Sequence, residues 1–482
     1  MKQMKLILQH KLTYRLWVLL GFGLLVRIWI YQTIDFAFNN DVHTFQSWAT
    51  ILYNYGLGQF YSSPAFTDYP PMYMYVLYIV GFLRSVFDWQ TIAHPEASQM
   101  FRFMIFFPAI IADLLIGLVL YFMVDKSFQK VRTSGKKRTK TVLNDSFALF
   151  IVALWLFNPA IILVSSVWGQ VESVFVLLLL LSLILVKRKN LLFGYILFGI
   201  AILTKPQSLF IAPVYLYSAI SYFTEKHENR SWYLPLSIFG AALVMVIVSI
   251  PFGLQDTLYQ ITRGIDSYNF ATINAYNLWA VFGGNWISLD TTFLGISYTI
   301  WGIGIVAVII LASLWVLHID HTKHNGKHWY LIVAGLFMLI FVFSVKMHER
   351  YLFPALVFLL IHYWENRNNK VLGMYFAFTI TYFYNCFDVL SRLNSGFWGR
   401  ELSIWAMWTS VANVILAIFF IWVTYCTLFK NSLFRNRIGN RTGNKIGNRM
   451  EIPKNASKQT EQKKQTGQKG QTKKKANNKS RN

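Results

Sequence analysis

The sequence predicts an all-α membrane protein with about twelve transmembrane helices. Of its 482 residues, 55% are hydrophobic and only 14% are charged, whereas a soluble domain is typically about a quarter charged. Apolar stretches of roughly the 20 residues that cross a bilayer recur along residues 1–429. Basic residues are concentrated in alternate connections between these stretches, as they are in polytopic membrane proteins. These observations exclude a water-soluble globule.

Twelve stretches are expected to span the membrane. They cover residues 16–34, 103–124, 147–166, 171–186, 191–204, 207–223, 234–251, 297–317, 329–345, 351–363, 371–388 and 404–428. A further apolar stretch, residues 72–83, follows Pro70 and Pro71 and is short for a span. We expect it to form a juxtamembrane helix within a first outer loop of residues 35–101.

The distribution of basic residues predicts the side of each loop. If residues 72–83 do not cross the membrane, 36 of the 45 Lys and Arg fall on one side. By the positive-inside rule that side is cytoplasmic. We therefore expect a multi-pass protein of the cell membrane with both termini in the cytoplasm and the alternate loops outside.

The last 53 residues, 430–482, differ in composition from the rest. They carry 16 Lys and Arg against two acidic residues, which accounts for +14 of the net charge of +24. Such a segment cannot bury a core, so we expect a disordered basic cytoplasmic tail. Its expected partner is anionic membrane lipid, and no nucleic-acid partner is expected.

Polar residues that a membrane span does not require gather in the loops expected outside. These clusters contain Asp41 and Trp48; Asp68 and Tyr69; Trp168, Gln170 and Glu172; Lys205 and Gln207; Asn274 and Asn277; and His348, Glu349 and Arg350. Each has an ordinary explanation as a solvated acid, a snorkelling cation or an aromatic anchor. Their coincidence on one face favours a functional site. Arg27 and Asp113 lie deep within spans, where a mutual pairing would account for both.

The order of these motifs resembles that of a known family. Asp41 precedes Gln-Ser-Trp, and Asp-Tyr-Pro-Pro, Ile-Ala-Asp-Leu-Leu, Trp-Gly-Gln, Thr-Lys-Pro-Gln, Asn-Ala-Tyr-Asn-Leu-Trp and His-Glu-Arg follow within residues 10–425. The series is similar to the GT-C glycosyltransferases. Within them it most resembles bacterial relatives of the second GPI-anchor mannosyltransferase and the dolichyl-phosphate-glucose-dependent glucosyltransferases. The resemblance implies a GT-C-like transmembrane catalytic domain in residues 1–429, with Asp41 as its catalytic carboxylate.

A transfer of this kind needs the residue types found in these loops. The phosphate of a polyprenyl-phosphate sugar gains negative charge as it leaves, and fixed cations stabilise that charge. We expect Lys205, His348 and Arg350 to bind the donor phosphate, and Asp41 to act as general base toward the acceptor hydroxyl. The expected substrate-binding residues are Trp48, Asp68, Tyr69, Gln170, Glu172, Gln207, Asn274 and Asn277.

We therefore expect an inverting hexosyltransferase of the bacterial cytoplasmic membrane with its active site on the outer face. It would move a mannose- or glucose-type sugar to an envelope glycan, glycolipid or protein. No cofactor and no metal are expected, because cations can serve the leaving group. The alternative is a transporter or flippase of lipid-linked saccharides, since polar residues between spans also mark translocation paths. A transporter should show related halves or polar residues throughout the membrane depth, and the sequence shows no such repeat.

Overall fold

Most of the chain is helical in the computed structural model, which describes residues 14–34, 39–88, 98–129, 137–224, 232–266, 268–396 and 399–430. Contacts divide the chain into two units, Met1–Thr424 and Tyr425–Asn482. Apart from residues 425–430, everything described below belongs to the first unit. The expected tail after Lys430, the basic N-terminal residues 1–13 and Asp35 lie outside the described residues.

The first half of this unit is a series of helices. In chain order they are α2 (Tyr14–Thr33), α3 (Asn39–Tyr55), η1 (Leu57–Gln59), α4 (Pro71–Phe87), α5 (Gln99–Gln129), α6 (Lys137–Leu156), α7 (Pro159–Ile162), η4 (Leu163–Val167), α8 (Glu172–Lys187), α9 (Leu191–Thr204), η5 (Pro206–Ile211) and α10 (Ala212–Thr224). The helix α4 coincides with the juxtamembrane helix expected at residues 72–83.

The second half combines helices with short strands. Its elements are α11 (Tyr233–Ser249), η6 (Ile250–Phe252), α12 (Leu254–Asp266), β1 (Thr272–Ile273), α13 (Leu278–Val281), β2 (Thr292–Phe293), β3 (Ile296–Ser297), α14 (Tyr298–His324), α15 (Trp329–Phe343), β4 (Met347–His348), η7 (Glu349–Leu352), α16 (Phe353–Asn366), α17 (Asn369–Asn394), α18 (Ile404–Tyr425) and η8 (Cys426–Lys430).

Two strand pairs were not predicted from the sequence. β1 runs parallel to β4, with Thr272 opposite Met347 and Ile273 opposite His348. β2 and β3 form a small antiparallel hairpin. Each strand has only two residues, too short to show an alternating pattern in sequence. The all-α class is otherwise confirmed, and the β1–β4 pair joins two of the predicted polar clusters.

Five helices of the described residues are long and apolar enough to cross a membrane. They cover Tyr14–Thr33, Gln99–Val124, Tyr233–Phe252, Tyr298–His324 and Ile404–Phe429. α14 shows why lipid rather than water surrounds them: Ile303 and Leu311 are 68% and 67% exposed. Large apolar faces of this kind are avoided in water and are normal against lipid. The protein is therefore a membrane protein.

The expected count of twelve spans is not reached by this criterion and stays a prediction. One expected span, residues 147–166, bends by 47° between Ser146–Leu156 and Pro159–Val167, and counting it would give six among the described residues. Others form short helices, such as the 14 residues of α9 and the 15 of α15. At 1.5 Å per residue these reach only about 22 Å, less than the roughly 30 Å hydrocarbon core.

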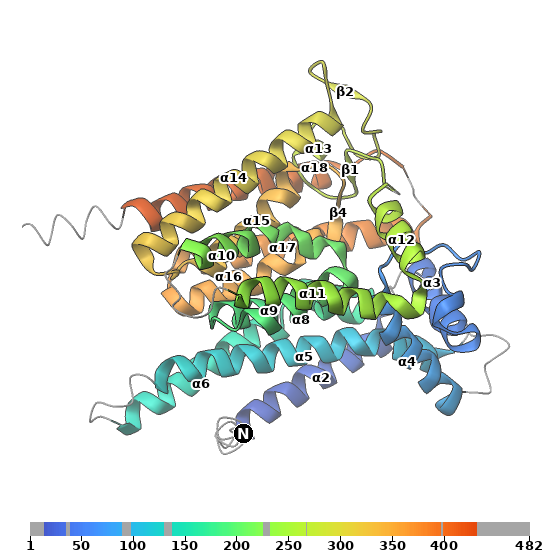
Figure 1. The fold of residues 1–482 in the computed structure, drawn as a ribbon, viewed down its shortest axis with the longest axis horizontal. Helices are drawn as coiled ribbons and strands as arrows, with labels where there is room; N and C mark the ends of the chain where they lie inside the picture. The colour runs from blue at the N-terminus through green and yellow to red at the C-terminus, as the bar shows by residue number, and fades with distance from the viewer. Residues whose placement is uncertain are drawn as a thin grey trace, which may run out of the picture. The chain divides into compact units, whose positions relative to one another are not determined.

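The core of the unit is built on α15 and α16, which pack against each other and are buried over most of their length. α17 packs on α16, α14 packs on α15, and α8 packs on α5 and α9. Figure 1 shows α15, α16 and α17 between α14 and α5. A helix that is apolar on all sides is stable only when it is surrounded by protein or lipid. The central helices are thus fixed by packing, which gives the polar loops at their ends a rigid base.

Two buried polar contacts support this packing. Arg27 and Asp113 are both fully buried, and Arg27 Nε lies 3.1 Å from Asp113 Oδ2, so the expected pairing is confirmed. Asn158 caps α7 by accepting from the backbone of Ala160 at 2.9 Å. Its amide nitrogen donates to the Tyr375 hydroxyl of α17 at 2.7 Å. The Asn-Pro break between α6 and α7 is therefore anchored to α17.

Candidate functional site

Asp41 lies in the first turn of α3 and holds three donors on a single oxygen. Its Oδ2 accepts from Trp168 Nε1 and from Gln170 Nε2, each at 2.9 Å, and from Arg350 Nη1 at 3.4 Å. The side chain is 32% exposed, and Oδ1 takes part in none of these bonds. Such donors orient a carboxylate, while the second oxygen can accept a hydrogen bond from a hydroxyl group.

Gly169 lets Trp168 and Gln170 reach the same carboxylate. It follows the π-helical turn η4 and has a φ of 75°, in the left-handed region that glycine enters at little cost. A Cβ at this position would also lie 2.8 Å from the Phe106 ring. The Trp-Gly-Gln motif of the sequence is therefore a turn that aims two donors at Asp41.

Lys205 stands where α9 ends. The proline that follows it excludes the helical conformation, and Lys205 has an extended backbone with φ −155° and ψ 121°. Its Nζ donates to Glu172 Oε1 at the start of α8, and the two side chains are only 7% and 0% exposed. Tyr69 and Tyr351 present rings to the same ammonium, at 5.8 Å and 6.0 Å from their centroids. Lys205 is thus held inside the protein by a carboxylate and aromatic rings rather than snorkelling to water.

Arg350 is shared among three carboxylates. Its Nη1 lies 3.4 Å from Asp41 Oδ2, and its Nε lies 3.3 Å from Glu349 Oε1 and 3.6 Å from Glu172 Oε1. The guanidinium also lies 4.9 Å above the Trp168 ring. The short β4 and the 3₁₀ turn η7 position it, and the Tyr382 hydroxyl of α17 donates to its carbonyl oxygen at 3.4 Å. Arg350 therefore links the late His-Glu-Arg motif to the first outer loop.

Among the described residues, three buried polar atoms of this cluster have no hydrogen-bond partner. One is Nε of Arg350, which makes only the ion-pair contacts given above. The others are Oε2 of Glu172 and Nε2 of Gln207, on side chains that are 0% and 6% exposed. A buried polar atom without a partner costs about 1–3 kcal/mol. Where such atoms lie beside charged groups in one cluster, a ligand or water can bind to them.

Asp68 and His348 lie in the same electrostatic environment, outside the candidate spans. Burial raises the pKa of Asp68 to about 6, although Arg350 and Lys205 oppose the shift. Burial, and then the charges of Arg350 and Lys205, lower the pKa of His348 to about 3. His348 is therefore neutral at physiological pH, so any contact it makes with a phosphate is a neutral hydrogen bond and not the cationic contact expected from the sequence. Tyr268 donates to Asp68 Oδ2 at 3.4 Å and stacks edge-on against His348 at 4.6 Å.

The other predicted residues lie at varying distance from this cluster. The Trp48 ring packs against Tyr69, with centroids 5.6 Å apart, and its Nε1 donates to the Phe66 carbonyl at 2.7 Å. The backbone of Asn274 forms an antiparallel β-bridge with the backbone of His348, next to the β1–β4 pair. Asn277 points elsewhere: it caps α13 and donates to the Phe341 carbonyl at 3.2 Å.

Sequence reasoning missed four residues of the cluster as site residues. They are Trp168, Tyr268, Glu349 and Tyr351. Trp168 and Glu349 stand inside motifs that were recognised, so motif membership could have found them. Tyr268 stands in no motif, and only the tertiary structure brings it to Asp68.

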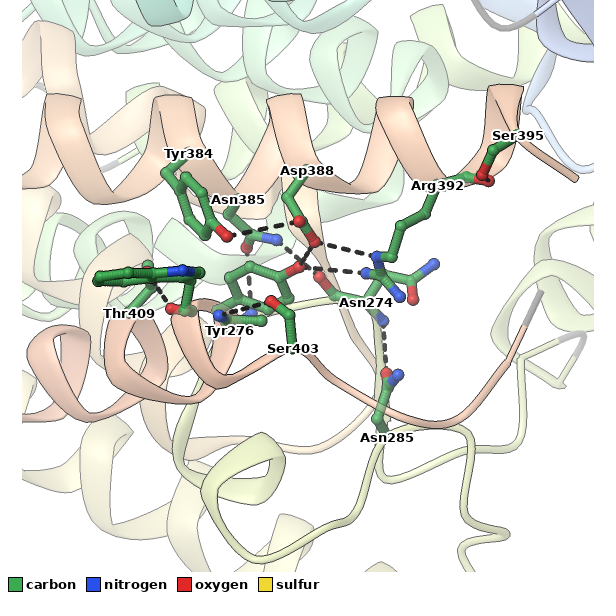
Figure 2. Close-up of polar contacts among 12 residues, drawn as sticks. Asn274, Tyr276, Asn285, Tyr384, Asn385, Asp388, Arg392, Ser395, Ser403 and Thr409 are labelled. Atoms are coloured by element: carbon green, nitrogen blue, oxygen red, sulfur yellow. Dashed lines mark hydrogen bonds and ion pairs between the residues drawn. The ribbon is translucent and has the colours of Figure 1, made fainter. Parts of the chain in front are cut away.

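A second polar cluster, which we call the α17 network, lies near the outer end of α17 as the sequence orients it. It consists of Tyr276, Tyr384, Asp388 and Arg392 (Figure 2). Asp388 Oδ2 accepts from the Tyr276 hydroxyl and from Arg392 Nε, the latter at 2.9 Å. Arg392 also donates to the Tyr276 hydroxyl at 3.1 Å, and Tyr384 donates to Asp388 Oδ1 at 3.4 Å. The network holds the segment that carries Asn274 and Asn277 against α17.

Chemically, the main cluster unites a carboxylate oriented through its Oδ2, the buried cation Lys205, the partly exposed cation Arg350 and several aromatic rings. The carboxylate can accept a proton from a hydroxyl, the cations can bind a phosphate, and aromatic faces can pack on a sugar ring. Four carboxylates surround the two cations, and burial raises the pKa of two of them, Asp68 and Glu349. No group of three or more His, Cys, Asp or Glu among the described residues is arranged to hold a metal ion.

Comparisons with known proteins agree with this picture in outline. The chain is 27% identical over 136 residues to GPI mannosyltransferase 1 of Eremothecium gossypii, a stretch that covers 26% of this chain and 33% of that protein. The match thus spans about a third of the curated relative. The likeness to membrane proteins of the GPI pathway is confirmed, while the narrower resemblance to relatives of the second GPI-anchor mannosyltransferase, and a bacterial source, stay predictions. The family model described as GPI transamidase subunit PIG-U matches residues 14–273, more than half of the chain, and the protein therefore belongs to that family.

Proposed function

We propose that this protein is an outward-facing, inverting hexosyltransferase that uses a polyprenyl-phosphate sugar as its donor. The observation that carries the proposal is the geometry of Asp41, whose Oδ2 is held by three donors while Oδ1 faces none of them. The buried Lys205 and the partly exposed Arg350 lie beside it as cations. The likeness to GPI mannosyltransferase 1 supports a mannose-type sugar.

In the proposed step the acceptor hydroxyl oxygen attacks the anomeric carbon of the donor sugar. The bond between that carbon and the phosphate oxygen breaks, and its electron pair leaves with the polyprenyl phosphate. Asp41 takes the hydroxyl proton, and Lys205 and Arg350 stabilise the charge that grows on the phosphate. The product is a glycoside of inverted configuration on an envelope glycan, glycolipid or protein.

The resting site also constrains donor binding. Lys205 is paired with Glu172, and Arg350 is shared with Glu172, Glu349 and Asp41. A donor phosphate has to replace part of these contacts, and the unpartnered Gln207 Nε2 is a further donor for it. His348, being neutral, contributes a hydrogen bond rather than charge.

The test is transfer by the purified protein in lipid vesicles, with polyprenyl-phosphate mannose and polyprenyl-phosphate glucose as donors. Asp41→Asn keeps the shape and much of the hydrogen bonding but removes the basicity. A general base contributes about 10²- to 10⁴-fold in rate, so the variant should lose transfer by that factor while donor binding persists. Asp256→Asn on the exposed surface of α12 is the matched control. Near-normal turnover by Asp41→Asn would show that the base is another carboxylate.

Family membership favours a second candidate, a non-catalytic subunit that binds a glycolipid for a partner enzyme. The family description names a transamidase subunit, and the two cations are already compensated by carboxylates. Under this reading the wild-type protein binds the lipid-linked sugar but transfers nothing, and Asp41→Asn lowers binding instead of turnover. The two candidates thus differ in whether wild-type protein consumes donor at all.

A further inference from the structure

The helix α12 has three distinct sides. Thr257 and Gln260 face the protein and are each 3% exposed. Leu254 and Leu258, 44% and 66% exposed, continue with Ile261 along one flank at the i, i+4, i+7 spacing of a helix face. The buried side of α12 is therefore polar, whereas an exposed side is apolar, which is the reverse of a helix on a water-soluble protein.

The opposite flank of α12 is charged. Asp256 and Arg263 are seven residues apart, so they share one side of the helix, and both are exposed. A helix with protein on one side, an apolar stripe on the second and charges on the third suits the boundary between lipid and water.

The apolar stripe continues the lipid-facing surface of α11. α11 is one of the candidate spans, with Phe239 and Ile247 64% and 54% exposed. The chain passes from it through Ile250, 57% exposed, and turns at Gly253 into α12 with Leu254 exposed. Figure 1 shows α12 leaving the end of α11 at a steep angle, as a helix in the membrane plane leaves a spanning helix.

The polar side of α12 is tied to the candidate site. Gln260 donates through Nε2 to the Thr67 carbonyl, and the Thr67 hydroxyl donates to Gln260 Oε1 at 3.2 Å. Thr67 directly precedes Asp68. Just beyond the end of α12, Tyr268 donates to Asp68 Oδ2. Thus Gln260 of α12 and Tyr268, two residues beyond the helix end, hold the Thr67-Asp68 segment at two points.

We propose that α12 is an interfacial helix whose Leu254, Leu258 and Ile261 insert between the lipids of one leaflet, and that its seating in the membrane positions Asp68 in the site. The lipid contact is inferred only from the exposed apolar residues of α11 and α12. The consequence for Asp68 rests on the proposed function. In that function a change in lipid packing around α12 alters the site through Gln260.

The first experiment measures lipid contact without any substrate. A fluorophore is attached at Leu258→Cys or, as matched control, at Asp256→Cys, in full-length protein with Cys386→Ala and Cys426→Ala. The proteins are placed in nanodiscs of phosphatidylcholine and phosphatidylglycerol with bromine high on the acyl chains. Brominated lipid should quench most of the fluorescence of the label at 258, and aqueous iodide should quench little of it. For the label at 256, iodide should quench most of the fluorescence and brominated lipid little. Equal quenching at both positions, or a label at 258 shielded from both quenchers as in a protein interface, would overturn the lipid contact.

The second experiment measures the tie between α12 and the Asp68 segment. Spin labels at Ser62→Cys and Thr262→Cys, both exposed positions, report the distance between the loop and the helix. Gln260→Ala should broaden that distance distribution, whereas Gln255→Ala, on the exposed side of the same helix, should leave it unchanged. An unchanged distribution in Gln260→Ala would refute the positioning role. Both readouts are independent of turnover, so absent transfer by the wild-type protein would refute the proposed function and not this inference.

Discussion

The cluster around Asp41 and the α17 network contain the same kinds of residues but bond them differently. In the α17 network one carboxylate, Asp388, meets one arginine, Arg392, a turn away on the same helix, and two tyrosines complete the contacts. In the Asp41 cluster a single arginine, Arg350, is shared among three carboxylates from three segments.

The two clusters also differ in what they leave unsatisfied. Among the described residues, the buried polar atoms without a partner include Glu172 Oε2 and Gln207 Nε2 of the Asp41 cluster and none from the four side chains of the α17 network. A closed set of contacts stabilises a fold, whereas a shared and incomplete set can exchange partners with a ligand. The comparison assigns a structural role to the α17 network and a binding role to the Asp41 cluster.

The largest expected effect comes from breaking the pair of Lys205 and Glu172. Both side chains are nearly fully buried, so Glu172→Leu leaves an unpaired buried ammonium and should cost about 3–5 kcal/mol. Adding Lys205→Met should restore most of the loss, because an apolar pair needs no compensation. Thermal unfolding in detergent measures both. The matched change Asp388→Leu, at a pair that is 15% and 17% exposed, should lower the free energy of unfolding by less. A larger loss from Asp388→Leu than from Glu172→Leu would contradict the difference between the two clusters.

The next largest difference is expected between Arg350→Lys and Arg392→Lys, in their affinity for the donor. Lysine keeps the charge of Arg350 but offers one point of contact in place of a guanidinium that reaches three carboxylates. We expect a loss of about 1–3 kcal/mol in donor binding, which corresponds to roughly 5- to 150-fold. Arg392→Lys should change donor binding little. Titration of the reconstituted proteins with polyprenyl-phosphate sugar measures this, and equal losses would mean that Arg350 is only structural.

The raised pKa of Asp68 predicts a dependence of stability on pH. Because its folded-state pKa is about 6 and its ordinary value is 3.8, the folded protein binds more protons than the unfolded chain between these values. Stability therefore falls as pH rises from about 4 to 6 and then levels off. Asp68→Asn removes this part of the slope, which thermal unfolding at several pH values can follow. An unchanged slope in the variant would place Asp68 in a more solvated environment.

The smallest expected effect is that of Tyr384→Phe in the α17 network. The change removes one hydrogen bond of 3.4 Å to Asp388, while Asp388 keeps Tyr276 and Arg392. A single hydrogen bond contributes about 0.5–1.5 kcal/mol, and a long one belongs at the lower end. Thermal unfolding should shift slightly and donor binding should not change. A measurable loss of donor binding would mean that the α17 network takes part in the site.

Part of the site could be predicted because its signals are local. Lys205 beside a proline at a span end, and the Trp-Gly-Gln turn, are visible in a few consecutive residues. The partners of these residues could not be predicted in the same way. No Lys or Arg stands near Asp41 in sequence, which suggested a carboxylate without a cationic partner, yet Arg350, 309 positions away, lies 3.4 Å from it.

By itself, the sequence determined that the protein is a helical membrane protein and which residues carry its unusual polarity; it suggested the pairing of Arg27 with Asp113, which the structure shows. Hydropathy and charge are properties of short runs of consecutive residues, so they can be read from the sequence without knowledge of the fold. Only the tertiary structure decided the partners of Asp41, the pKa of Asp68, the neutral state of His348 and the placement of α12. These depend on distances and burial between segments far apart in sequence, which are fixed when the central helices α15, α16 and α17 pack together.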